Sequence, residues 1–132
     1  MNAQVILSVD DEAIILLALK RELKSIFKDR FRYETAMDAE EGLRVMDELA
    51  LEGLDVILVI SDWLMPGMKG DEFLSRIHDK HRGIKTIMIT GHADPESIRR
   101  VMAQSGTYAV LRKPWIRAEL IAAVSGCVGI SG

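Results

Sequence analysis

Five polar side chains in this sequence share one kind of position, the end of a short apolar run. They are Asp10 and Asp11 after Gln4–Val9, Asp62 after Leu54–Ser61, Thr90 at the end of Ile84–Thr90, and Lys113 after Thr107–Arg112. If the runs are parallel strands, their carboxyl ends lie at one edge of the sheet, where ligands bind in open α/β sheets. The sequence therefore predicts that three carboxylates, one hydroxyl and one ammonium converge there.

The chemistry that this set could perform is phosphoryl transfer to a carboxylate. Three carboxylates close together repel one another strongly, unless a cation neutralises them or some of them stay protonated. A site with only oxygen ligands suits a hard ion, and Mg²⁺ is the common choice. Asp62 beside Mg²⁺ could act as a nucleophile, with Lys113 supplying a positive charge and Thr90 a hydrogen bond. Taken singly, such residues could be a helix cap, a surface lysine and a strand former, and only their joint placement favours the functional interpretation.

The elements that must position these residues alternate between strand and helix. The strands are predicted over Gln4–Val9, Phe31–Ala36, Leu54–Ser61, Ile84–Thr90 and Thr107–Arg112, and the helices over Glu12–Phe27 and about 38–51, 70–81, 94–106 and 115–124. Asp38, with Glu41 three residues later, has the pattern of a helix start, and Pro95 suits a first helical turn. This alternation predicts a parallel sheet covered by helices on both faces, with right-handed crossovers.

Composition restricts the class of protein further. With 132 residues, 48% hydrophobic and 28% charged, the chain is predicted to form one globular domain. A net charge of −3 provides no general attraction to nucleic acid or to anionic lipid. Cys127 is the single cysteine and cannot form an internal disulfide. Because no leader-like segment and no bilayer-length apolar run is evident either, we expect a cytoplasmic protein.

Four short motifs stand in a characteristic order along the chain. They are VDDE (Val9–Glu12), SDWLMPGMKG (Ser61–Gly70), ITG (Ile89–Gly91) and KPW (Lys113–Trp115). With these motifs the chain resembles the receiver domain of two-component response regulators over nearly its whole length, and around Asp62 it is similar to the single-domain chemotaxis regulators. The resemblance implies a flavodoxin-like (βα)5 three-layer sandwich, with a five-stranded parallel sheet in the order 2-1-3-4-5. We assign residues 1–126 to the receiver domain and predict an irregular tail over residues 127–132, where no periodicity is evident.

The resemblance also implies a role for each site residue. Asp62 would accept a phosphoryl group from a histidine kinase phosphohistidine or from a small acyl phosphate. The Mg²⁺ ligands would be Asp11, Asp62 and the backbone carbonyl of Leu64, with Asp10 reaching the ion directly or through water. Thr90 and Lys113 would bind the phosphoryl oxygens, and the Lys113–Pro114 peptide bond would be cis. Such a domain is a signalling switch that assists its own phosphorylation and dephosphorylation, not an enzyme with a separate substrate.

Several positions depart from the usual family pattern. In the family an aromatic residue three positions before the lysine turns inward on phosphorylation, whereas here that residue is Val110. Tyr108 is two residues earlier, so we expect it on the same side of the strand but further from the site. Leu64 and His92 occupy the positions that flank the path of the hydrolytic water. Replacing either of them is therefore predicted to change the lifetime of the aspartyl phosphate.

The implied partners are a sensor histidine kinase or phosphotransfer protein, and an output domain or target protein on the face formed by the fourth helix, fifth strand and fifth helix. A dimer stays open, and no direct contact with nucleic acid or a membrane is expected.

His78 and His81 could share a metal ion, but no third ligand is evident in the sequence. Two competing functions also stay open: an aspartate-nucleophile phosphatase, which usually has a second aspartate where this chain has Leu64, and an interaction module that works without phosphorylation.

Overall fold

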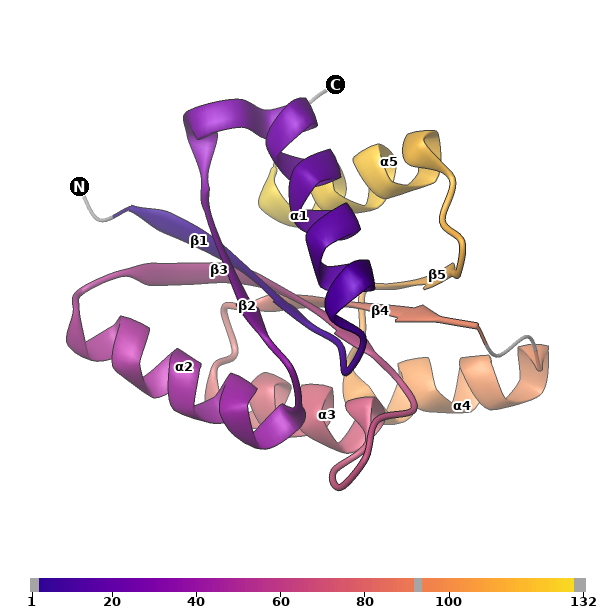
Figure 1. Ribbon diagram of the computed structural model, residues 1–132. Coiled ribbons are helices and arrows are strands. Elements are labelled where there is room, and N and C mark those ends of the chain that lie inside the picture. Colours follow the sequence, from indigo (N-terminus) through magenta and orange to yellow (C-terminus); the bar gives the residue numbers. More distant parts are fainter. Residues whose placement is uncertain (1–2, 92–93, 130–132) are drawn as a thin grey trace.

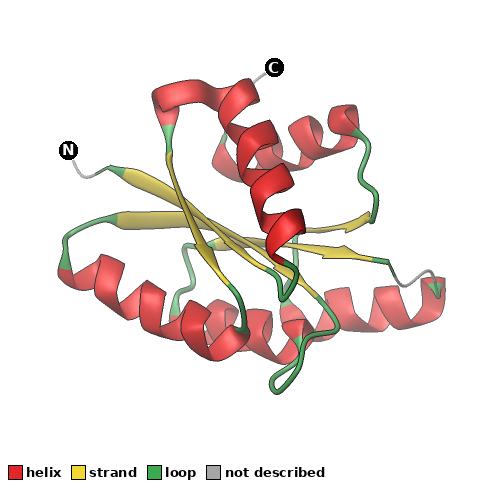
Figure 2. Cartoon of the chain, viewed as in Figure 1, coloured by secondary structure: helices red, strands yellow, loops and turns green. Residues whose placement is uncertain are grey.

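The sheet of this protein is parallel, and each of its strands is followed by a helix (Figure 2). The computed structural model describes residues 3–91 and 94–129. The strands are β1 (Gln4–Val9), β2 (Arg32–Ala36), β3 (Asp55–Asp62), β4 (Lys85–Thr90) and β5 (Ala109–Arg112), and the helices are α1 (Ala13–Phe27), the short 3-10 helix η1 (Lys28–Arg30), α2 (Ala39–Leu51), α3 (Gly70–Lys80), α4 (Pro95–Ser105) and α5 (Arg117–Val128). The strand order is β2-β1-β3-β4-β5, which confirms the flavodoxin-like fold.

The helices form two layers, one on each face of the sheet (Figure 1). α1 and α5 cover one face, and α2, α3 and α4 cover the other. The first core cluster includes Ile6, Ile60 and Ile89 from the strands with Leu19, Leu23 and Leu120 from the helices. The second includes Leu7, Val59 and Met88 with Met46, Phe73 and Val101. Neighbouring strand residues thus contribute to different clusters, because successive side chains of a strand point to opposite faces. Among the described residues, no helix has the length and apolarity needed to cross a membrane.

The pairing register brings the ends of the strands to one level. Val9 pairs with Ser61, so that Asp10, directly after β1, and Asp62, the last residue of β3, lie at the same edge of the sheet. Thr90 pairs with Arg112, immediately before Lys113. The fold therefore presents these polar side chains together, as the sequence predicts.

Local hydrogen bonds define helix ends close to the predicted positions. At the start of α2, Asp38 Oδ1 accepts a hydrogen bond from the Glu41 N–H at 2.8 Å, and Glu41 Oε1 accepts one from the Met37 N–H at 2.9 Å. Asp94 caps α4 with Pro95 in its first turn. Gly106 ends α4 in the left-handed conformation that favours glycine.

The last helix differs from the prediction at both ends. α5 begins at Arg117 rather than Trp115, and it continues through Val128, so that Cys127 and Val128 are helical where an irregular tail is predicted. The helix continues because Cys127 and Val128 pack against the first core cluster. They follow Leu120, Ala123 and Val124 at helical spacing and so extend the same apolar face. Gly129 ends the helix in the left-handed conformation.

The expected position of Tyr108 is also wrong. Its hydroxyl lies against Gly126 of α5, so close that a Cβ on Gly126 would overlap it. Val110 instead packs with the second core cluster, on the side of α2, α3 and α4. Because β5 begins only at Ala109, the alternation of side chains along a strand does not extend to Tyr108.

Candidate functional site

Two buried carboxylates and one ammonium form the centre of the site. Asp10 and Asp62 are 4% and 6% exposed. Lys113 Nζ lies 2.8 Å from Asp10 Oδ2 and 3.2 Å from Asp62 Oδ2. One lysine therefore joins the end of β5 to the ends of β1 and β3, and each of these distances is short enough for a charge-assisted hydrogen bond.

The remaining oxygens of the two carboxylates are held by backbone N–H groups. Asp10 Oδ1 accepts a hydrogen bond from the Glu12 N–H at 2.9 Å. Asp62 Oδ1 accepts one from the Trp63 N–H at 2.8 Å. These bonds fix the orientation of both carboxylates before any ligand arrives.

The electrostatics of the site disfavour a full set of negative charges. Burial raises the pKa of Asp62 above its ordinary value, repulsion by Asp10 raises it further, and Lys113 offsets only part of this effect. Burial lowers the pKa of Lys113, but Asp10 and Asp62 together outweigh burial and leave that pKa raised. The lysine is therefore firmly protonated, whereas the ionised form of Asp62 is costly without a further positive charge.

The acidic residues at this edge are arranged so that they could hold that charge. Asp10, Asp11 and Asp62 each offer one carboxylate oxygen, and these atoms lie within 4.8 Å of one another. It is the only such group of three or more His, Cys, Asp or Glu residues among those that the structure describes. Oxygen-only ligands suit Mg²⁺, which binds to few carboxylates and keeps several of its waters.

Two further elements complete the edge of the sheet. Thr90 is 2% exposed at the end of β4, and its carbonyl accepts a hydrogen bond from the Lys113 N–H at 2.9 Å. The main chains of Thr90 and Lys113 are thus joined by a hydrogen bond. The Lys113–Pro114 peptide bond is cis, as predicted.

The loop after β3 is shaped by close backbone packing. The Gly70 N–H donates a hydrogen bond to the Trp63 carbonyl at 2.6 Å, and the Ser61 hydroxyl donates one to the Asp62 carbonyl at 2.8 Å. A Cβ on Gly70 would overlap the Asp62 carbonyl oxygen. Leu64 is 47% exposed, so its side chain is not packed into the core.

Reasoning from the sequence missed one residue of this site and placed another beyond what the structure describes. Glu12 Oε1 lies 3.7 Å from Lys113 Nζ, although the sequence assigned Glu12 only to the start of a helix. The signal that could have found it is its place directly after the two aspartates of the VDDE motif. His92, the second residue predicted to affect hydrolysis, lies outside the described residues.

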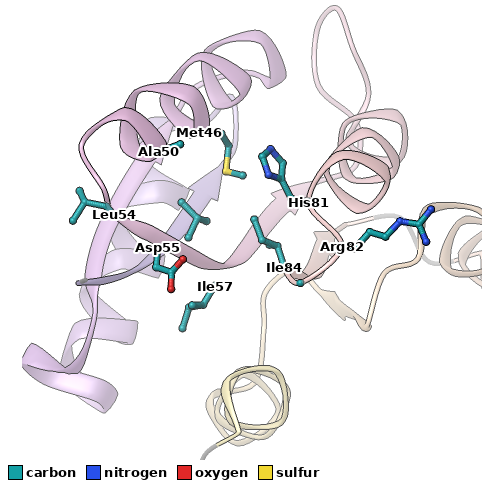
Figure 3. A pocket seen from close by; sticks show the side chains of 10 residues that line it. Met46, Ala50, Leu54, Asp55, Ile57, His81, Arg82 and Ile84 are labelled. Carbon is teal, nitrogen blue, oxygen red and sulfur yellow. The ribbon is translucent and has the colours of Figure 1, made fainter. Parts of the chain in front are cut away.

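The histidine pair does not form a second centre. His78 packs its ring against Gly106, at the turn between α4 and β5. His81 instead lines a pocket of about 370 Å³ at the opposite end of the sheet, where Met46 and Ala50 of α2 face Ile84 (Figure 3). Because the side chains point to different places, no shared metal site results among the described residues.

Comparison with known proteins agrees with this arrangement. The model of the response regulator receiver domain family matches residues 6–125. Chemotaxis protein CheY-3 of Vibrio cholerae is 31% identical over 117 residues, which cover 87% of this chain and 84% of that protein. Hydrogenase transcriptional regulatory protein HoxA of Cupriavidus necator is 32% identical over 127 residues, 96% of this chain but only 24% of HoxA. A crystal structure of the signal receiver domain of an HD domain-containing protein from Pseudomonas fluorescens superposes with a TM-score of 0.81 at 29% identity, covering 98% of this chain and 96% of that one.

The chain therefore belongs to the response regulator receiver domain family. Receiver domains are signalling switches of two-component systems rather than classical enzymes. Their acidic pocket binds Mg²⁺, and the aspartate cluster at this sheet edge corresponds to such a pocket. The chain spans about a quarter of the length of HoxA and 47% of response regulator RppA of Synechocystis, so these relatives carry further segments that it does not match.

Proposed function

We propose that this domain is switched by transfer of a phosphoryl group to Asp62. The observation that carries the proposal is the position of Lys113 Nζ, 2.8 Å from Asp10 and 3.2 Å from Asp62. A lysine held between two buried carboxylates can exchange one of them for a phosphoryl oxygen without leaving the site. The phosphodonor is a phosphohistidine of a sensor kinase or phosphotransfer protein, or a small acyl phosphate.

Mg²⁺ fits the residues that are present. Asp10, Asp11 and Asp62 would hold it, together with the backbone carbonyl of Leu64, because the carboxylate oxygens are already within 4.8 Å of one another. The ion would neutralise the negative charge that gathers where a phosphoryl group meets these carboxylates.

The transfer itself needs one nucleophile and two groups that bind phosphoryl oxygens. A carboxylate oxygen of Asp62 forms a bond to phosphorus while the bond from phosphorus to the donor breaks, and the leaving nitrogen or oxygen of the donor keeps the electron pair. Lys113 exchanges its contact with Asp62 Oδ2 for an oxygen of the transferred group. The Thr90 hydroxyl donates a hydrogen bond to another oxygen, and the domain thereby assists its own phosphorylation.

Hydrolysis returns the domain to its resting state. Leu64 lies two residues after the phosphoacceptor and has no polar group to orient water, so its side chain shields the aspartyl phosphate. We expect Leu64→Asn to shorten the phosphoryl lifetime, since an amide can hold the attacking water. Equal decay rates for Leu64→Asn and the unmodified domain would show that Leu64 has no such role.

The setting of the switch follows from the family. A cytoplasmic histidine kinase pathway suits this chain, and the face formed by α4, β5 and α5 would transmit the change to an output domain or target protein. A phosphatase is less well supported, because Leu64 stands where an aspartate acid/base would be needed. An interaction module that works without phosphorylation would not need Lys113 to be held between two buried carboxylates.

The test is to incubate the domain with Mg²⁺ and acetyl phosphate or beryllofluoride. Intact mass should show a Mg²⁺-dependent phosphoryl adduct that is absent from Asp62→Asn. Fluorescence should report beryllofluoride, because Trp63 is buried next to Asp62 and its backbone N–H donates a hydrogen bond to the Asp62 carboxylate. An adduct that persists in Asp62→Asn, or no adduct on the unmodified domain with either reagent, would refute the proposal.

A further inference from the structure

Glu12 is a helix N-cap residue whose side chain does not cap its helix. Its carbonyl accepts hydrogen bonds from the Ile15 and Leu16 N–H groups at 3.1 and 3.2 Å, which places it at the start of α1. Its carboxylate makes no capping hydrogen bond. Instead, Oε1 lies 3.7 Å from Lys113 Nζ. The side chain is thus turned from the helix toward the phosphorylation site.

The exposure of these side chains shows which one meets solvent first. The side chains of Asp10 and Asp62 are 5% and 7% exposed and that of Lys113 is 15% exposed, whereas that of Glu12 is 58% exposed. Glu12 therefore lies on the solvent side of Lys113. At 3.7 Å it is an ion pair partner of the lysine but is too distant for a good hydrogen bond. It adds negative charge at the entrance and contributes little to holding the lysine.

We propose that Glu12 is a specificity-determining residue that disfavours small, freely diffusing anionic phosphodonors. This inference rests on the proposed function of Asp62. A dianionic donor must approach Lys113 beside the Glu12 carboxylate. Such a small donor contacts only the residues around Lys113, so all of its binding energy comes from them. A donor carried by a protein partner gains additional binding from contacts elsewhere, so the same repulsion matters less for it.

The expected change in donor binding follows from the repulsion between the single charge of Glu12 and a dianion in a hydrated site. At separations of several ångströms and physiological ionic strength, such a pair changes association by about threefold. The effect is on binding, because the Glu12 carboxylate is paired with Lys113 Nζ and not with Asp62, which would accept the phosphoryl group. It should also weaken with added salt.

The experiment compares Glu12→Gln with the unmodified domain in phosphorylation by acetyl phosphate. Initial rates are followed by Trp63 fluorescence or intact mass, with Mg²⁺ saturating for each protein because the Glu12 charge also attracts the cation. We expect the apparent KM for acetyl phosphate to fall about threefold, with little change in the maximal rate, and the difference to shrink as the salt concentration rises toward about 1 M.

Glu48→Gln is the matched control. It makes the same change in net charge on the exposed surface of α2, and it should leave the kinetics unchanged. An unchanged KM in Glu12→Gln, an equal shift in Glu48→Gln, or a fall in the maximal rate that salt does not alter would each overturn the role of Glu12. If the unmodified domain forms no adduct at all, it is the proposed function that fails.

Discussion

Gly70 provides the sharpest test of how the loop after β3 positions Asp62, the proposed phosphoacceptor. In Gly70→Ala the new Cβ would overlap the Asp62 carbonyl oxygen and lie 2.8 Å from both Asp62 C and Trp63 Cα. These are main-chain atoms, so they cannot rotate aside. The loop must move away from β3, and the hydrogen bond from the Gly70 N–H to the Trp63 carbonyl, at 2.6 Å, is lost or stretched.

The expected loss of stability combines two contributions. Forcing extra volume into packed structure costs about 1–3 kcal/mol, and losing one hydrogen bond costs about 0.5–1.5 kcal/mol. The total of about 1.5–4.5 kcal/mol should lower the Tm by about 6–18 °C, at about 4 °C per kcal/mol for a domain of this size. The displaced loop should also slow the formation of the beryllofluoride adduct, because Asp62 moves with it.

Two other Gly→Ala variants are controls in a thermal melt followed by circular dichroism. They show what an added Cβ costs when it meets no neighbouring atom. Gly83→Ala places its Cβ in open space and should change stability by no more than about 0.5 kcal/mol. Gly67→Ala also meets no neighbour, but its φ of +79° should cost about 1 kcal/mol. If Gly70→Ala melts within about 2 °C of the unmodified domain, the close approach of this loop to β3 does not constrain the site, and the reasoning is refuted.

Three further predictions concern pH, thiol chemistry and helix capping. The pKa of Asp62 is raised in the folded domain, so without a bound ion the domain should lose stability as pH rises from the unfolded-state pKa of Asp62 through its folded-state pKa. With a chelator at pH 7, Asp62→Asn should therefore have a higher Tm than the unmodified domain. In acid, where Asp62 is protonated, the two Tm values should become equal. Burial raises the pKa of Cys127 to about 11, so at pH 8 its reaction with a disulfide reagent should be at least about tenfold slower than in urea. Asp38→Ala removes the cap on the Glu41 N–H and should cost about 1 kcal/mol by urea titration, while Asp38→Asn should cost less.

The sequence predicts where Asp10, Asp62 and Lys113 lie, because their placement depends mainly on where strands end. Asp10, Asp62 and Lys113 follow apolar runs, and the parallel register brings these ends to one level. No information beyond strand and helix alternation is needed to expect them together. The contact of Glu12 with Lys113 could not be predicted in this way, because it depends on one side chain turning from its helix toward the site.

The errors lie in the C-terminal third and have two different causes. Ser125 and Gly126 interrupt the apolar residues near the end of α5, but Cys127 and Val128 follow Leu120 and Val124 at helical spacing, so this extension of the helix could have been predicted. Tyr108 instead lies against Gly126 of α5, and a contact between residues this far apart cannot be seen in a window of a few residues.

Two contacts indicate how this domain would transmit the proposed phosphorylation. Val110 is β-branched and packs with the second core cluster, so its χ1 is restricted and it cannot swing between two positions as an aromatic ring does. The Lys113 N–H is bonded to the Thr90 carbonyl at 2.9 Å, so any shift of Lys113 toward a phosphoryl oxygen also pulls on the end of β4. We therefore expect the signal to reach α4 and β5 through main-chain displacement, and Val110→Ala to leave the beryllofluoride-induced change in Trp63 fluorescence intact.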